Sequence, residues 1–146
     1  ELDANCAQAH FELGVAQGTL GKPAEAIKSF EFVISREPRN AAAYSNLGMY
    51  RSATGDVKGA IQALERATAI NPQFAEAHTN LGNIYFNMRQ YHKAIAAADA
   101  AIKANRQFST AHALRGASLQ RIGDLIGARA ALSEATRLDN RWAKLL

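Results

Sequence analysis

The stretch Asn80-Leu81-Gly82 identifies the fold of this chain, because its Leu-Gly pair, or a close variant, recurs at intervals of 34 residues. The copies are Leu13-Gly14, Leu47-Gly48, Leu81-Gly82 and Arg115-Gly116. Each glycine is followed twelve residues later by an alanine, and these alanines are Ala26, Ala60, Ala94 and Ala128. A period of this length indicates a stack of helix pairs, because one pair cannot bury its apolar face without neighbours. The sequence therefore predicts an all-α structure, an α-solenoid of antiparallel helix pairs.

The period divides the chain into four repeats with short flanking pieces. We expect repeats at 7–40, 41–74, 75–108 and 109–142, after the tail of a preceding repeat at 1–6 and before the start of a further repeat or a cap at 143–146. The residues Leu2-Asp3-Ala4-Asn5 align with the closing residues of a repeat, which supports this division. We therefore expect flanking repeats or another domain in the full-length protein.

Small residues and helix-ending residues recur at fixed places in each repeat. The paired glycine and alanine allow two helix backbones to approach more closely than large side chains would permit. A further glycine, at Gly21, Gly55 and Gly123, is suited to ending the first helix of its repeat. Asp56 and Asp124 follow two of these glycines and can cap the second helix.

These residues resemble the signature of the tetratricopeptide repeat (TPR) family, W-x2-L-G-x2-Y…A-x3-F…A…P. The matching segments are His78-x2-Leu81-Gly82-x2-Tyr85 and Ala60-x3-Leu64-x2-Ala67…Pro72. The resemblance covers residues 7–142 and implies a right-handed superhelical α-solenoid whose first helices line a concave groove. The departures from the signature are Arg106 and Asn140 in place of the terminal Pro, and Arg115 in place of Leu.

Residues on the side of each first helix away from its packing face are candidates for the groove surface. These candidates are Phe11, Ser45, Asn46, Met49, Thr79, Asn80, Asn83, Phe86, Asn87, Gln120 and Arg121. Asn80, Asn83 and Asn87 have the spacing i, i+3, i+7, so we expect one stripe of amides beside Phe86. An Asn side chain both donates and accepts hydrogen bonds, so it can pair with the backbone of an extended peptide without requiring a particular sequence.

Asn46 occupies the place of Asn80 one repeat earlier. Paired Asn residues at this place resemble the asparagine ladder in the TPR region of O-linked N-acetylglucosamine transferases, and that resemblance implies recognition of a peptide backbone. Glu12 and Leu114 interrupt the column in the first and fourth repeats. The alternative is that each Asn bonds a neighbouring helix or water.

Several other kinds of site find no support in the residues. Chaperone-binding TPR domains clamp a C-terminal carboxylate with Lys, Arg and Asn, and this chain offers only the Asn, so such a partner is not expected. His10, His78 and His112 share one repeat position, but equivalent positions in neighbouring repeats are ~8–10 Å apart, too far to share a metal ion. The sequence shows no nucleophile–base pair and no glycine-rich phosphate loop. We therefore predict that the chain is not an enzyme and holds no cofactor and no metal.

Composition and charge argue against membrane insertion and against nucleic-acid binding. Charged residues are 21% and hydrophobic residues 48% of the chain, ordinary proportions for a soluble domain. No apolar run approaches the ~20 residues that cross a bilayer, so no membrane insertion is expected. Residues 1–76 contain seven Lys/Arg and nine Asp/Glu, whereas residues 77–146 contain ten and four. The basic half could attract an acidic partner, but we favour the interpretation that its charges form a solvated outer face. No stripe of aromatic residues accompanies the basic residues, so no nucleic-acid binding is expected.

The sequence thus predicts a non-catalytic protein–protein interaction scaffold that binds an extended segment of a protein or peptide partner in its groove. Two alternatives stay open. The chain could be the substrate-targeting TPR region of a larger enzyme such as a glycosyltransferase, or it could self-associate through the ends of the array. The sequence identifies neither the partner nor the pathway nor the oligomeric state, and a cytoplasmic location is only slightly favoured.

Overall fold

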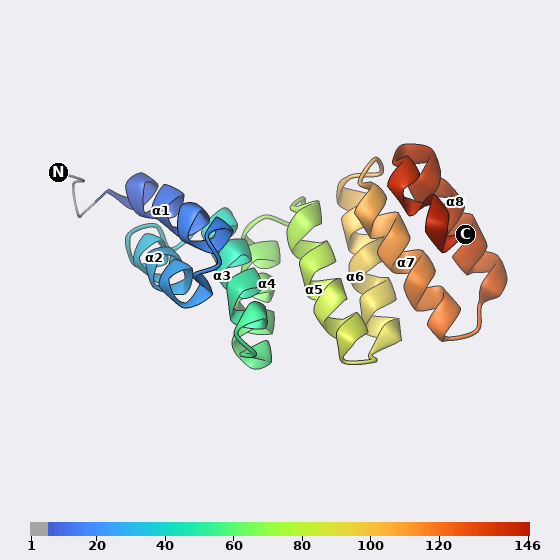
Figure 1. Ribbon diagram of the computed structural model, residues 1–146, viewed down its shortest axis with the longest axis horizontal. Helices are drawn as coiled ribbons and strands as arrows, with labels where there is room; N and C mark the ends of the chain where they lie inside the picture. Colours follow the sequence, from blue (N-terminus) through green and yellow to red (C-terminus); the bar gives the residue numbers. More distant parts are fainter. Residues whose placement is uncertain (1–5) are drawn as a thin grey trace. The chain divides into compact units, whose positions relative to one another are not determined.

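The computed structural model describes residues 6–146, and within them it contains α-helices, one 3₁₀ helix and no strand (Figure 1). The elements are α1 (Ala7–Thr19), α2 (Pro23–Arg36), α3 (Ala41–Ala53), α4 (Val57–Ile70), α5 (Ala75–Asn87), α6 (Tyr91–Ala104), α7 (Ser109–Arg121), α8 (Leu125–Leu138) and the 3₁₀ helix η1 (Asn140–Leu145). The all-α prediction is confirmed. The segment Leu2-Asp3-Ala4-Asn5, compared above with the end of a repeat, lies outside the described residues.

The chain forms two compact units, of which the first ends at Asn71 and the second is Pro72–Leu146. The first unit contains α1–α4 and the second contains α5–α8 with η1. Within each unit, consecutive helices pack against one another, and α5 also contacts α7. Each unit therefore presents one face built from its first helices (α1 and α3, or α5 and α7) and another built from its second helices (α2 and α4, or α6 and α8). We refer to the former as the first-helix face.

In the second, third and fourth pairs, the two helices approach closely where the recurring glycine meets the recurring alanine. A Cβ atom placed on Gly48 would lie 3.0 Å from the carbonyl oxygen of Ala60 and 2.6 Å from Cγ of Leu64. Such separations are shorter than packed carbon atoms tolerate, so only glycine fits without displacing its neighbours. The same contact recurs at Gly116 with Ala128 and Leu132. The predicted close approach of the helix backbones is confirmed.

The third repeat fills the space above its glycine in a different way. Ala98 stands where Phe30, Leu64 and Leu132 fill the other repeats. Leu114 of α7 enters the vacated space instead, and its Cδ2 would lie 2.6 Å from a Cβ placed on Gly82. Leu114 is consequently only 6% exposed. Leu114 occupies the repeat position of Asn46 and Asn80. The column of Asn residues ends at the fourth repeat because Leu114 packs in the core.

The first helices end in a left-handed residue, as the glycine spacing predicts. This residue is Gly21, Gly55 or Gly123, with φ of 73°, 89° and 87°. In the third repeat the same place is taken by Arg89 with φ of 60°, an unfavourable conformation for a residue with a Cβ atom. The Arg89 amide donates to the carbonyl of Phe86 at 2.9 Å, one of the two bonds of a Schellman helix end.

The predicted caps of the second helices are also confirmed. The carboxylate of Asp56 accepts a hydrogen bond from the amide of Gly59 at 2.9 Å, and Asp124 accepts one from Gly127 at the same distance. Each bond satisfies a backbone donor that the first turn of a helix leaves free.

The packing around Gly82 predicts a compensating pair of substitutions. Ala98→Leu alone should destabilise the protein by about 1–3 kcal/mol, because two leucines would compete for one space. Leu114→Asn alone should cost about 2–5 kcal/mol, since it empties that space. The double variant should lose at least about 1 kcal/mol less than the sum of the two, because it restores the packing of the other repeats. Urea unfolding curves measure this coupling, and strictly additive losses would contradict it.

The left-handed residue of the third repeat predicts a stabilising substitution. Arg89→Gly should raise the free energy of unfolding by about 0.5–1 kcal/mol, because glycine adopts positive φ without a steric penalty. Gly55→Ala is the matched control, since no atom lies within 4 Å of the added Cβ and only the backbone conformation is tested. It should destabilise by a similar amount. A lower midpoint temperature of thermal unfolding for Arg89→Gly than for the wild type would contradict the steric penalty assigned to Arg89.

Candidate functional site

The first-helix face of the second unit carries the predicted amide stripe. Asn83 and Asn87 are exposed and Asn80 is half-buried on α5. Their spacing of three and four residues places them along one side of that helix. We call Asn80, Asn83 and Asn87 the asparagine stripe.

An aromatic side chain next to this stripe is in contact with a cation from α7. The guanidinium carbon of Arg121 lies 5.7 Å from the ring centroid of Phe86, within the range of a cation–π interaction. The ring of Tyr91 meets the same phenyl ring edge-on, with centroids 5.4 Å apart. Two residues that the sequence predicted independently, Phe86 and Arg121, are thus brought together.

A pocket of about 240 Å³ opens between α5, α7 and η1. Its lining residues are Asn83, Phe86, Thr110, Ala113, Leu114, Ala117, Trp142 and Leu145. The indole N–H of Trp142 donates to the hydroxyl of Ser109 at 3.3 Å, which fixes η1 against the start of α7. We call this the α5–α7 pocket. Sequence reasoning missed its η1 wall, although Trp142 occupies the repeat position of Phe74 and Phe108 and its size was a usable signal.

Two predicted groove residues are buried, and their placement on the groove surface is wrong. Ser45 is 3% exposed and Thr79 is 2% exposed. The Thr79 hydroxyl donates to the carbonyl of Ala75 at 2.9 Å within its own helix. Both occupy the fifth position of a repeat, where Phe11 is half-buried and meets Phe30 edge-on with centroids 5.4 Å apart. This position faces neighbouring helices, because a helix packed on two sides buries a wider arc than one packed on a single side.

The first unit offers fewer free polar groups on its first-helix face. The side-chain amide of Asn46 donates to the carbonyl of Ala42 at 2.9 Å, so it bonds its own helix. Met49 is 40% exposed. Phe11 packs on the aromatic core, as described above. The predicted residues of this unit therefore present an exposed thioether and one internally bonded amide.

Gln120 lies apart from the α5–α7 pocket. It is exposed near the end of α7 and lines a separate hollow of about 200 Å³ together with Leu125 and Arg129 of α8 and the last residues of the chain. The structure therefore does not group Gln120 with the asparagine stripe.

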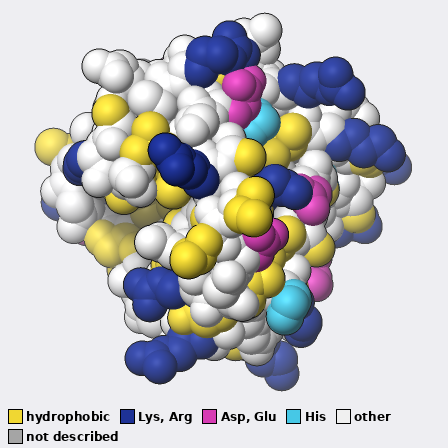
Figure 2. All heavy atoms as spheres, turned by 90° about the vertical axis from the view of Figure 1, so that its right-hand side faces the viewer, with side chains coloured by type: hydrophobic (Ala, Val, Ile, Leu, Met, Phe, Trp, Pro, Cys, Tyr) yellow, Lys and Arg dark blue, Asp and Glu magenta, His cyan; other side chains and the backbone are white. Residues whose placement is uncertain are grey.

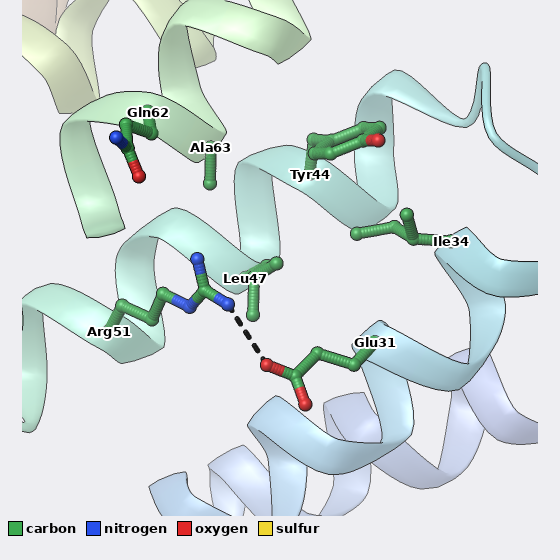
Figure 3. A pocket seen from close by; sticks show the side chains of 7 residues that line it. All are labelled: Glu31, Ile34, Tyr44, Leu47, Arg51, Gln62 and Ala63. Carbon is green, nitrogen blue, oxygen red and sulfur yellow. Dashed lines mark hydrogen bonds and ion pairs between the residues drawn. The ribbon is translucent and has the colours of Figure 1, made fainter.

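A pocket of about 260 Å³ in the first unit lies between α2, α3 and α4 (Figure 3). Arg51 spans it, and a guanidinium nitrogen lies 2.9 Å from the Glu31 carboxylate. The same guanidinium reaches Asp56 at 3.9 Å. The charge of Arg51 is therefore paired within the fold, and the pocket is lined by the second helices α2 and α4 together with α3. We assign it a packing role.

The histidines at the fourth repeat position hold loops in place. Nε2 of His78 lies 2.9 Å from the carbonyl oxygen of Pro72, and Nε2 of His112 lies 2.9 Å from that of Arg106. The ring of His10 lies against Phe32, with centroids 3.9 Å apart. Residues 6–146 contain no group of three or more His, Cys, Asp or Glu that could hold a metal ion.

Charge is unevenly distributed between the units. Residues 72–146 contain ten Lys/Arg and five Asp/Glu. Figure 2 looks towards α8 and shows Lys and Arg side chains spread around exposed hydrophobic ones. On α8 itself, the hydrogen bond from Arg137 lowers the pKa of Glu134, and the same bond raises the pKa of Arg137. Arg137 is exposed and Glu134 half-buried on a second helix, so they do not form a catalytic pair at the asparagine stripe.

Sequence comparison identifies the family. Two tetratricopeptide repeat models match the chain, over residues 11–75 and 51–117. The chain belongs to the tetratricopeptide repeat family. No curated protein is similar enough in sequence to match it. Among residues 6–146, no helix is both long and apolar enough to cross a membrane.

Solved structures of TPR proteins share this fold over almost the whole chain. The crystal structure of MamA is 29% identical, with a TM-score of 0.86, and the match covers 97% of this chain and 83% of that one. PilF of Pseudomonas aeruginosa is 21% identical with a TM-score of 0.85, covering 98% and 70% of the two chains. A thermophilic TPR protein of Thermus thermophilus, TTC0263, is 23% identical with a TM-score of 0.81, covering 92% and 75%. The predicted α-solenoid is confirmed, and a general role as a protein-interaction scaffold is supported.

The burial of the fifth repeat position can be checked by thiol labelling. In a Cys6→Ser background, Asn83→Cys and Met49→Cys should react readily with a maleimide. Thr79→Cys and Ser45→Cys should react on the order of a hundredfold more slowly, because a buried thiol reacts only when the structure opens locally. Equal rates for Asn83→Cys and Thr79→Cys would contradict the burial described above.

Proposed function

We propose that this chain is a non-catalytic scaffold that binds an extended segment of a partner protein along its first-helix face. The asparagine stripe beside the α5–α7 pocket, with Asn83 and Asn87 exposed, is the observation that carries this proposal. Membership of the TPR family and the resemblance to TPR structures support a scaffold role in general. The stripe and the pocket support peptide binding in particular.

The spacing of the stripe suits the backbone of an extended peptide. A helix rises 1.5 Å per residue, so neighbouring members of the stripe are offset along α5 by roughly 4.5 Å and 6 Å. Groups on the same side of an extended peptide recur every two residues, or roughly 6.6–6.8 Å. Flexible amides that both donate and accept can accommodate this difference and bond successive peptide groups. The proposal needs no particular side chains on the partner.

Self-association is the second candidate, and it rests on a different surface. Ile126 and Leu125 of α8 are 87% and 66% exposed. Large apolar side chains exposed next to one another mark interaction sites more often than scattered ones do. This reading makes no use of the asparagine stripe, so the two candidates can be separated by one set of variants.

Selection from a displayed library of random peptides tests the main proposal. Peptides selected on the protein should bind the triple variant Asn80→Ala/Asn83→Ala/Asn87→Ala about tenfold or more weakly, because three hydrogen bonds of about 0.5–1.5 kcal/mol each are lost. The control, His92→Ala/Lys103→Ala, alters exposed residues of α6 in the same unit and should bind normally.

The outcomes separate the candidates. Unchanged binding by the triple variant, or no selected peptide at all, would refute the role of the stripe. A mass that rises with protein concentration in sedimentation, equally in the wild type and the triple variant, would favour self-association instead. The circular dichroism spectrum of each variant should match that of the wild type, because none of the substituted side chains is buried in the core.

A further inference from the structure

The α5–α7 pocket has the size and polarity to hold one apolar side chain. Its lining includes the apolar residues Phe86, Leu114 and Ala117, and its polar residues are Asn83 and Thr110. A volume of about 240 Å³ is below the ~300–1,000 Å³ of pockets that enclose a drug-sized molecule. The pocket therefore suits a single side chain of a bound peptide better than a free small molecule.

The wall contributed by η1 is apolar because its one polar group is already bonded. The indole N–H of Trp142 donates to the Ser109 hydroxyl at 3.3 Å. The carboxylate of Asp139 accepts a hydrogen bond from the amide of Arg141 at 3.1 Å and holds the start of η1. With its N–H engaged, the indole offers its ring surface to the pocket, and Leu145 extends this wall.

A cation without an acidic partner lies beside the pocket. Arg121 is exposed, and its guanidinium carbon is 5.7 Å from the centroid of Phe86, which lines the pocket. Arg115 and Arg137, by contrast, pair with Asp99 and Glu134. Within residues 6–146, no Asp or Glu forms an ion pair with Arg121. The guanidinium is therefore available to a carboxylate of the partner, which the basic character of the second unit would also attract.

We propose that the second unit recognises a short motif in an acidic partner protein, a large apolar residue with an Asp or Glu within about three residues of it. The apolar side chain fills the α5–α7 pocket and the carboxylate binds Arg121. An extended peptide advances about 3.3 Å per residue, so a carboxylate this close to the apolar residue can reach a guanidinium that lies 5.7 Å from the ring centroid of Phe86. This inference rests on the proposed function and adds the chemistry of the partner to it.

The two contacts contribute unequally to affinity. Burying a large apolar side chain in the pocket contributes most, and replacing it by Ser in the peptide should weaken binding about tenfold or more. The carboxylate meets an exposed guanidinium, where solvent screens the pair. Replacing that residue by Asn or Gln should weaken binding about threefold to tenfold, and more at low salt than at high salt.

Two substitutions in the protein test the two halves of the motif. Arg121→Glu should reverse the charge preference in a peptide selection, so that Lys or Arg replaces Asp or Glu beside the apolar residue. Ala117→Met should fill the pocket and abolish the preference for a large apolar residue. Methionine is tolerated at this position, since Met49 occupies it in the second repeat. The control Arg129→Glu makes the same change of charge on α8 and should leave both preferences intact.

A direct readout comes from Trp142, the single tryptophan of the chain. A synthetic peptide selected on the wild type should shift its fluorescence, because the indole lines the pocket. The same peptide with Ser in place of its apolar residue should bind about tenfold more weakly and leave the emission unchanged at matched saturation.

The results distinguish this inference from the proposed function. Selected peptides that bind through the asparagine stripe but lack the apolar–acidic motif would overturn the inference and leave the proposed function standing. If no peptide binds the wild-type protein, both the inference and the proposed function are overturned. An unaltered charge preference in Arg121→Glu would overturn the role of Arg121.

Discussion

The close approach of two helix backbones is the constraint on which the rest of this structure depends. In three of the pairs a glycine on the first helix faces an alanine on the second, and a Cβ atom on Gly48 would lie 3.0 Å from the carbonyl of Ala60. At that separation the two helices cannot rotate about their axes without collision. The orientation of the first helix is therefore fixed, and so is the set of side chains that it turns outward. The asparagine stripe is displayed because Gly82, on the other side of α5, is held against α6.

One change in the core alters the chemistry of the surface. Ala98 leaves a space that a Phe or Leu fills in the other repeats, and Leu114 moves into it from α7. Leu114 takes the place that Asn occupies in the second and third repeats, so the column of amides ends there. The same leucine lines the α5–α7 pocket. Because Ala98 is small, the fourth repeat has the apolar Leu114 at the position where the second and third repeats have Asn.

The elements that depend on local geometry could be predicted from the sequence. A glycine at positive φ and an aspartate at a helix start each act through neighbouring residues, and the structure confirms both. The 34-residue period repeats these local signals and so indicates the stack of helix pairs. The burial of Ser45 and Thr79 could not be predicted in this way, because it depends on how many helices surround one helix face. The η1 wall of the pocket was missed for a related reason. Its position depends on a contact between Trp142 and Ser109, 33 residues apart in the chain, which the repeat position of Trp142 alone does not specify.

The two units differ in how many polar groups they leave free for a partner. In the first unit, Asn46 bonds its own helix and Arg51 pairs with Glu31. In the second, Asn83 is exposed and Arg121 stacks on an aromatic ring without an acidic neighbour among the described residues. Groups already satisfied within the fold gain little by bonding a peptide, because one hydrogen bond replaces another. Binding free energy should therefore concentrate in the second unit, which departs most from the TPR signature.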